Sequence, residues 1–217
     1  MGAGGHGKEI LAYVEDLKKG GSKIDVKGFI DEVKLPVPFE STKILGDLKY
    51  LERAVRRSKI SFHYLTAIGD NQGRKEFVER LEKSNFKNLR AWTLIHPLAH
   101  VGRKVKIGEG SCLAPGSITT THVVLGKHCI VNVGVSISHD CVIGDFSNIN
   151  PSATLCGNVK IGEGCFVGTG AKVVQKISIG DWSVIGAGAV VTADIPAHVT
   201  AIGIPARIVK KLAKGGF

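Results

Sequence analysis

The sequence lacks several features that would indicate a membrane protein, a zinc ribbon or a disulfide-stabilised protein. Its 217 residues contain no run of about 18 apolar residues and no basic-then-apolar leader, so we predict no membrane span and a cytoplasmic location. Five cysteines without a CxxC pair argue against a zinc ribbon and against a disulfide framework. The sequence has no RNA- or DNA-binding motif and no interleaving of aromatic and basic residues, so the net charge of +10 argues against a nucleic-acid partner. It indicates instead a basic surface that suits small polyphosphates or only keeps the protein soluble.

A six-residue repeat fills the second half of the chain. From Ile95 to Val191 an aliphatic residue recurs at every sixth position, with Thr119 as the exception. A period of six fits neither an α-helix nor a simple strand alternation, but it matches a parallel β-helix in which three hexads form one coil. We therefore predict inward-facing aliphatic anchors that stack in coils about 4.8 Å apart. Cys129, Cys141 and Cys165 fall in a small-residue slot of this repeat and are predicted to be small buried hydrophobic residues.

The first ninety-odd residues alternate between helical and extended patterns. This alternation predicts a small parallel sheet in an α/β domain. We place this domain at residues 1–94 and the β-helix at 95–217, with a short C-terminal tail or helix. The predicted helices lie at 8–19, after 44–47 and at 74–84, and the predicted strands at 26–30, 60–68 and 89–94.

The chain opens with a glycine-rich loop. Gly2, Gly4 and Gly7 fit a dinucleotide-binding fingerprint, and Asp25 or Asp31 lies at the distance expected for a ribose-binding acid. A dinucleotide needs two mononucleotide halves, and this domain supplies one half-Rossmann unit, so a nucleotide-linked substrate fits better than NAD. The alternative is that the glycines only form a tight turn.

Seven motifs occur in the order typical of one family. They are GAGGHGKEI (2–10), GFIDE (28–32), ILGD (44–47), AIGDNQGRK (67–75), LIHPLA (94–99), SHDCVIGDF (138–146) and GIPAR (203–207). On these motifs the chain resembles the bacterial nucleotide-sugar acetyltransferases of the left-handed β-helix class, which include the bacillosamine, perosamine and sialic acid acetyltransferases. The resemblance implies a homotrimer with acetyl-CoA between neighbouring β-helices, a nucleotide sugar on the half-Rossmann domain, and no metal.

One departure from the family lies at the start of the chain. Relatives carry a hydrophobic strand before GAGGH, whereas only Met1 precedes the loop here. We expect a shortened chain or a misplaced start, a sheet that lacks one strand, and weakened nucleotide affinity.

The candidate catalytic residues lie at corners of the predicted β-helix. His139 and Asp140 fall on outward-facing positions, and a neutral imidazole can act as a general base near pH 7. Gly157, eighteen residues after His139, should occupy the same corner one coil on and offer an N–H to the thioester oxygen. The resemblance implies that His139 is the base, Asp140 its partner and Gly157 the oxyanion donor. His122 is the second candidate for the base, and Asn132 matches a family position near the site or forms a hydrogen bond at its own corner.

The resemblance also implies binding residues for both substrates. Small side chains would let the pantetheine arm of acetyl-CoA lie along the β-helix wall, although some relatives have histidine where Asn148 stands. For acetyl-CoA the positions are Asn148, Gly157, Thr169 and Ala187, with Arg207, Lys210 and Lys211 either at the phosphates or in a solvated tail. For the nucleotide sugar they are Gly4, Gly5 and His6 at the phosphates, Asp31 and Glu32 at the nucleoside, and Gly69 at the adjoining strand end.

Several functions stay open at this point. A β-helix metalloenzyme of the γ-carbonic-anhydrase type could use His122, His128 and His139, but its HxxxxH spacing is missing. A nucleotide-binding solenoid without activity is another alternative. Among acetyltransferases, N-acetylation of a UDP- or GDP-linked 4-amino-4,6-dideoxy sugar is favoured over O-acetylation of sialic acid. Direct transfer is predicted because no cysteine stands where an acyl-enzyme would need it.

Overall fold

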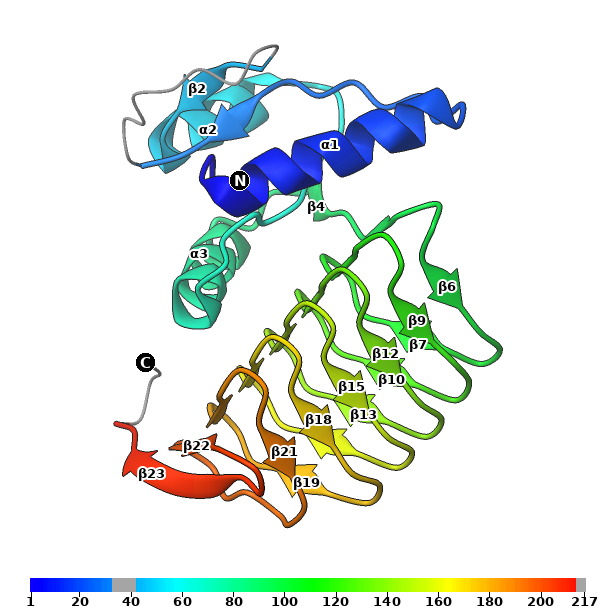
Figure 1. Cartoon of the computed structure of the whole chain (residues 1–217). Helices are drawn as coiled ribbons and strands as arrows, with labels where there is room; N and C mark the ends of the chain where they lie inside the picture. The colour runs from blue at the N-terminus through cyan, green and yellow to red at the C-terminus, as the bar shows by residue number, and fades with distance from the viewer. Residues whose placement is uncertain (33–41, 214–217) are drawn as a thin grey trace. The chain divides into compact units, whose positions relative to one another are not determined.

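The computed structural model describes residues 1–32 and 42–213, and the chain divides into two compact units, Met1–Trp92 and Thr93–Phe217 (Figure 1). None of the helices in these residues has both the length and the apolar character needed to cross a bilayer.

The first unit alternates helices and short parallel strands, as predicted. Its elements are α1 (Gly5–Lys19), β1 (Phe29–Ile30), β2 (Ile44–Gly46), α2 (Leu48–Arg57), β3 (Phe62–Tyr64), α3 (Asn71–Lys83) and β4 (Leu89–Ala91). Strand β1 pairs with β2 and strand β3 with β4, each pair in parallel. Helix α1 buries Ile10, Tyr13 and Val14 at helical spacing, while Asp47 and Asp70 cap α2 and α3 by accepting backbone N–H groups.

The first two residues stand between the two strand pairs. The amino group of Met1 donates to the carbonyl of Leu65 at 2.5 Å, and the Met1 carbonyl accepts from the N–H of Ala67 at 2.5 Å. On the other side, the Gly2 N–H donates to the Ile30 carbonyl at 2.9 Å. Among the described residues the sheet is therefore two separate strand pairs that residues 1 and 2 bridge.

The second unit is a three-sided parallel β-helix (Figure 1). Its strands are β5 (Leu94–Ile95), β6 (His100–Val101), β7 (Lys106–Ile107), β8 (Cys112–Leu113), β9 (Ile118–Thr119), β10 (Val124–Leu125), β11 (Ile130–Val131), β12 (Ser136–Ile137), β13 (Val142–Ile143), β14 (Asn148–Ile149), β15 (Thr154–Leu155), β16 (Lys160–Ile161), β17 (Phe166–Val167), β18 (Lys172–Val173), β19 (Ser178–Ile179), β20 (Val184–Ile185), β21 (Val190–Val191), β22 (Val199–Ile202) and β23 (Arg207–Lys211). They form three sheets with the orders β5-β8-β11-β14-β17-β20-β22-β23, β6-β9-β12-β15-β18-β21 and β7-β10-β13-β16-β19.

The aliphatic anchors stack in the predicted register. Ile137 pairs with Leu155 one coil on, eighteen residues later, and both side chains are fully buried. Thr119, the exception in the repeat, is also fully buried, and its hydroxyl donates to the His100 carbonyl at 3.1 Å. The polar side chain is therefore tolerated because its hydrogen bond is made inside the coil. Cys129, Cys141 and Cys165 are buried as predicted.

The last coil departs from the eighteen-residue period. Ile185 pairs with Ala201 and Ile179 with Ile195, sixteen residues apart in both cases. Ile195 stands four residues after the anchor Val191, which is the small-residue slot of the repeat, but it pairs with the anchor Ile179 and so takes an anchor position itself. The segment after residue 206 is strand β23, antiparallel to β22, where the sequence predicts a tail or helix. The free edge of β22 offers backbone partners that stabilise an extended segment.

Candidate active site

His139 and Asp140 form the corner between β12 and β13. The ring Nδ1 lies 2.8 Å from Asp140 Oδ2, and about half of each side chain is exposed. Because an ionised carboxylate only accepts hydrogen bonds, Nδ1 carries the proton and Nε2 of the neutral ring has a free lone pair. The left-handed backbone of Asp140, φ +60°, turns the chain at this corner. This corner therefore presents an oriented, solvent-accessible ring nitrogen.

Gly157 lies on the same corner one coil later. A Cβ at this position would lie 2.5 Å from both Cε1 and Nε2 of His139, so the imidazole stands directly over the glycine backbone. The Gly157 carbonyl accepts from the Lys176 N–H at 3.0 Å, whereas the Gly157 N–H has no hydrogen-bond partner within the described residues. The structure thus brings together a ring nitrogen that can accept a proton and an uncommitted backbone donor.

The other two catalytic candidates, His122 and Asn132, lie on different coils or corners from His139 and Gly157. His122 stands one coil before Asp140 on the same corner, and its Nδ1 lies 2.9 Å from the hydroxyl oxygen of Thr121. Asn132 lies at the preceding corner, between β11 and β12, where its Oδ1 accepts from the Val133 N–H at 2.7 Å. Asn132 therefore makes the corner hydrogen bond that the sequence allows as its alternative role.

The residues predicted to bind acetyl-CoA follow His139 in the chain. Thr169 and Ala187 are exposed on one corner in successive coils, and the Gly188 N–H donates to the Thr169 carbonyl at 2.8 Å. Asn148 on β14 is only 4% exposed, so its side chain is not accessible on the surface of this chain. Arg207 is exposed on β23, as are Lys210 and Lys211.

The four glycines of the N-terminal loop differ in their surroundings. A Cβ on Gly2 would lie 2.6 Å from the Ala67 carbonyl oxygen, and one on Gly7 would lie 2.5 Å from the Gly2 carbonyl oxygen. Close backbone packing therefore explains Gly2 and Gly7. A Cβ on Gly4 or Gly5 would meet open space. Gly4 is the N-cap of α1 and Gly5 is its first residue, and the first N–H groups of a helix lack intrahelical partners. This end of α1 is therefore suited to bind an anion.

Acidic residues follow β1 beside this loop. Asp31 Oδ2 accepts from the Ala3 N–H at 2.7 Å, whereas Asp25 forms an exposed pair with Lys27. Of the two predicted ribose-binding acids, Asp31 is therefore the one at the loop. Glu32 forms a half-exposed ion pair with Arg80 at 2.9 Å, and Gly69 precedes the Asp70 cap of α3 and faces open space.

His6 and Arg74 are two further titratable or charged groups in the first unit, and the charge of Arg74 acts on the His6 ring. His6 is mostly buried, with Nδ1 2.9 Å from Glu9 Oε2. Burial lowers the pKa of His6, the nearby Arg74 charge lowers it further, and Glu9 opposes both. Arg74 is fully buried and donates to the Ile68 carbonyl at 2.7 Å, which fixes the backbone just before Gly69. Arg74 is not among the predicted site residues, because a charged residue in a helix usually faces solvent.

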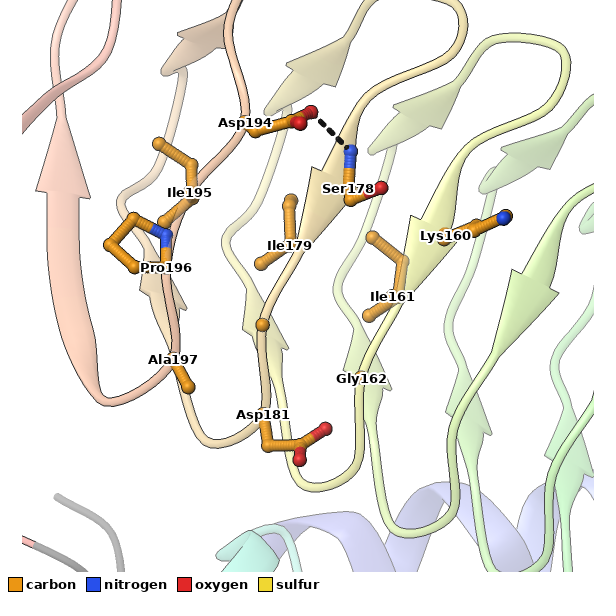
Figure 2. A pocket seen from close by; sticks show the side chains of 11 residues that line it. Lys160, Ile161, Gly162, Ser178, Ile179, Asp181, Asp194, Ile195, Pro196 and Ala197 are labelled. Atoms are coloured by element: carbon orange, nitrogen blue, oxygen red, sulfur yellow. Dashed lines mark hydrogen bonds between the residues drawn. The ribbon is translucent and has the colours of Figure 1, made fainter.

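A groove of about 580 Å³ lies elsewhere on the β-helix, along β16, β19 and the segment 194–197 (Figure 2). Asp194 Oδ1 accepts from the Ser178 N–H at 2.8 Å at its edge, and the side chains of Lys160 and Asp181 also line it. None of the predicted site residues lines this groove. The candidate active site is therefore the corner that holds His139 and Gly157, and not this groove.

The three histidines considered for a metal are not grouped. His128 is buried and stacks on Phe146, with ring centroids 5.3 Å apart and planes 10° apart, whereas His122 and His139 lie on a different corner. Residues 1–32 and 42–213 contain no cluster of three His, Cys, Asp or Glu side chains that could hold a metal ion.

Comparison with known proteins first defines the class. Residues 1–81 match the PglD N-terminal domain family, and residues 158–193 match the bacterial transferase hexapeptide family of six repeats. No curated protein sequence matches the chain. With the stacked sheets, these matches define a hexapeptide-repeat transferase whose solenoid is the predicted left-handed β-helix.

Solved structures then define the family. PerB from Caulobacter crescentus, solved with CoA and GDP-perosamine, is 32% identical with a TM-score of 0.85 over 96% of this chain and 95% of that chain. The acetyltransferase domain of PglB from Neisseria gonorrhoeae is 32% identical with a TM-score of 0.84 over 96% and 97%. WeeI from Acinetobacter baumannii is 30% identical with a TM-score of 0.83 over 96% and 97%. The chain therefore belongs to the PglD-type family of nucleotide-sugar acetyltransferases.

Proposed function

We propose that this protein is an acetyl-CoA-dependent N-acetyltransferase acting on a UDP- or GDP-linked 4-amino-4,6-dideoxy sugar. The observation that carries the proposal is the stacking of the His139 imidazole on the Gly157 backbone, in a chain that aligns over almost its full length with PerB bound to CoA and GDP-perosamine. A base beside an uncommitted N–H is the arrangement that acyl transfer to an amine requires.

The reaction proceeds by direct transfer. The sugar amine attacks the thioester carbon while His139 Nε2 takes the proton from the nitrogen, and Asp140 stabilises the resulting imidazolium through the Nδ1–H bond. The Gly157 N–H donates to the oxygen that becomes negative in the tetrahedral intermediate. The C–S bond then breaks, and the imidazolium returns its proton to the CoA sulfur. No cysteine is needed as an acyl carrier.

Two binding regions serve the two substrates. The open N-terminal end of α1 at Gly4 and Gly5, next to His6, receives the diphosphate of the nucleotide sugar, since helix N-termini stabilise anions. Asp31 accepts from the ribose, with Glu32 toward the base and Gly69 beside the phosphates.

Acetyl-CoA occupies the cleft between β-helices of a homotrimer. In this arrangement Thr169 and Ala187 form a low wall along the pantetheine arm, because both are small and exposed on one corner. Arg207 contributes positive charge toward the CoA phosphates. Of the residues expected to contact acetyl-CoA, Asn148 is the weakest candidate because it is buried. The expected compartment is the cytoplasm.

The proposal is tested with a thiol-release assay. Acetyl-CoA is supplied with UDP-, GDP- and CMP-linked amino sugars, and with sialic acid as an O-acetylation acceptor. We expect release of CoA with a UDP- or GDP-linked 4-amino sugar and a loss in kcat of about 100-fold or more in His139→Ala, with unchanged circular dichroism. Turnover near the wild-type rate in that variant would remove the base assignment.

A further inference from the structure

His122 is a second exposed imidazole close to the reaction centre. It occupies the position of Asp140 one coil earlier, and both residues have left-handed backbones, φ +56° and +60°. The Asp140 N–H donates to the Thr121 carbonyl at 3.2 Å, which ties the two corners together. With coils about 4.8 Å apart and successive Cα atoms about 3.8 Å apart, the Cα atoms of His122 and His139 are separated by only about 6 Å.

The hydrogen bonds around Thr121 fix the tautomer of His122. The single hydroxyl proton of Thr121 is donated to the Arg103 carbonyl at 2.9 Å. The same oxygen lies 2.9 Å from His122 Nδ1 and must therefore accept a proton from it. Neutral His122 consequently carries its proton on Nδ1 and keeps a free lone pair on Nε2. His139 has the same tautomer for a different reason, because a carboxylate accepts from its Nδ1.

The hydrogen-bond partners of the His139 and His122 rings differ, and this difference gives the two rings different roles. An imidazolium at His139 is stabilised by the Asp140 carboxylate, whereas the Nδ1 of His122 donates to a neutral hydroxyl. His122 is therefore suited to accept a hydrogen bond and not to hold a proton.

The side from which the sugar approaches follows from Gly157. The oxyanion donor lies one coil after His139, so the acetyl group is held on that side of the imidazole. The acceptor sugar takes the opposite side, where the preceding coil presents His122. In a 4-amino-4,6-dideoxy sugar, the amine-bearing C4 is flanked by C5, which carries the C6 methyl group, and by C3, which carries a hydroxyl. The C3 hydroxyl is therefore the hydrogen-bond donor next to the amine.

We propose that Nε2 of His122 accepts a hydrogen bond from the C3 hydroxyl of the acceptor sugar and so determines specificity for a hydroxyl beside the amine. This inference rests on the proposed function. It makes His122 a substrate-contacting residue that orients the amine toward His139, and it requires the Thr121 hydroxyl to hold the ring in the correct tautomer.

The test compares the amino sugar that the wild type acetylates with its 3-deoxy analogue. We expect the analogue to lower kcat/KM of the wild type about tenfold, the effect of one lost hydrogen bond. His122→Asn should lower kcat/KM for the parent sugar by a similar factor and no longer distinguish the two sugars. Asparagine tolerates the left-handed backbone, as Asn158 does at φ +61° on this corner, but its amide does not reach the Nε2 position.

Lys104→Asn is the matched control, because Lys104 has φ +57° on the same corner one coil before His122. It should discriminate between the two sugars as the wild type does. Nitrogen-15 NMR of the ring supplies a second measurement: His122 should show the Nδ1–H tautomer, lose it in Thr121→Val, and shift at Nε2 when the nucleotide sugar is added.

The outcomes separate this inference from the proposed function. Turnover by the wild type with undiminished discrimination in His122→Asn would overturn the role of His122 alone. Equal wild-type rates with the parent and 3-deoxy sugars would do the same. A wild type that acetylates none of the amino sugars would overturn the proposed function, and this inference with it.

Discussion

Replacing Gly157 with alanine tests whether the stacked geometry is what makes the site active. The added Cβ would lie 2.5 Å from Cε1 and Nε2 of His139, whereas carbon contacts are ordinarily about 3.5 Å or longer, so the ring must move by about 1 Å. A displacement of that size at a reacting group can reduce the rate about 100-fold. We expect kcat to fall by about this factor with little change in KM for acetyl-CoA.

The same substitution should leave the fold intact. The φ of Gly157 lies outside the left-handed region, so alanine can adopt the backbone, and the half-exposed ring can rotate away at small cost. The melting temperature should stay within about 4 °C of the wild type. In a His139→Ala background the clash is absent and the backbone N–H of residue 157 is kept, so adding Gly157→Ala should lower kcat little further. Near-wild-type kcat in the single variant, or an undiminished additional loss in the double variant, would refute the argument.

Two further predictions concern buried titratable groups. Burial raises the pKa of Cys165 to about 12 and also raises that of Cys141. Of the five cysteines, iodoacetamide at pH 8 should therefore modify the half-buried Cys156 first. Mass spectrometry should find all five modified after denaturation. Equal labelling of Cys165 in the folded protein would contradict this. Burial lowers the pKa of His6, so below about pH 6.5 the unfolded state binds a proton that the folded state does not, and stability falls as the pH falls toward the lowered value. His6→Gln should flatten that decline in urea denaturation between pH 7.5 and 5.5, and an unchanged slope would exclude His6 as its source.

The β-helix could be predicted closely because one physical rule repeats along it. Every anchor must face the same narrow core, so the six-residue period leaves a clear trace from Ile107 to Ile179. Where that rule stops, prediction also stops. The last coil is two residues shorter at Ile195, and β23 follows it as an antiparallel strand. Both features depend on which backbone edge the folded β-helix leaves unpaired, and the local sequence pattern does not encode this.

The site was predictable to the extent that it follows coil arithmetic. The spacing of eighteen places Gly157 under His139, and the structure has them in contact distance. Side-chain directions do not follow from spacing. The Asn132 side chain turns back to its own corner because it accepts a local backbone hydrogen bond. Asn148 is buried by the packing of its neighbours. Arg74 escaped detection because its burial depends on a carbonyl supplied by the preceding strand end.

The antiparallel hairpin at the end of the solenoid has a consequence for assembly. A stack of parallel coils has an exposed rung at each end, onto which another chain could add without limit, as in a growing fibre. Strand β23 covers the last rung of one sheet in the opposite direction, and Arg207, Lys210 and Lys211 are exposed on it. We expect the reversed strand direction and the like charges to oppose the end-to-end addition of another chain at this sheet.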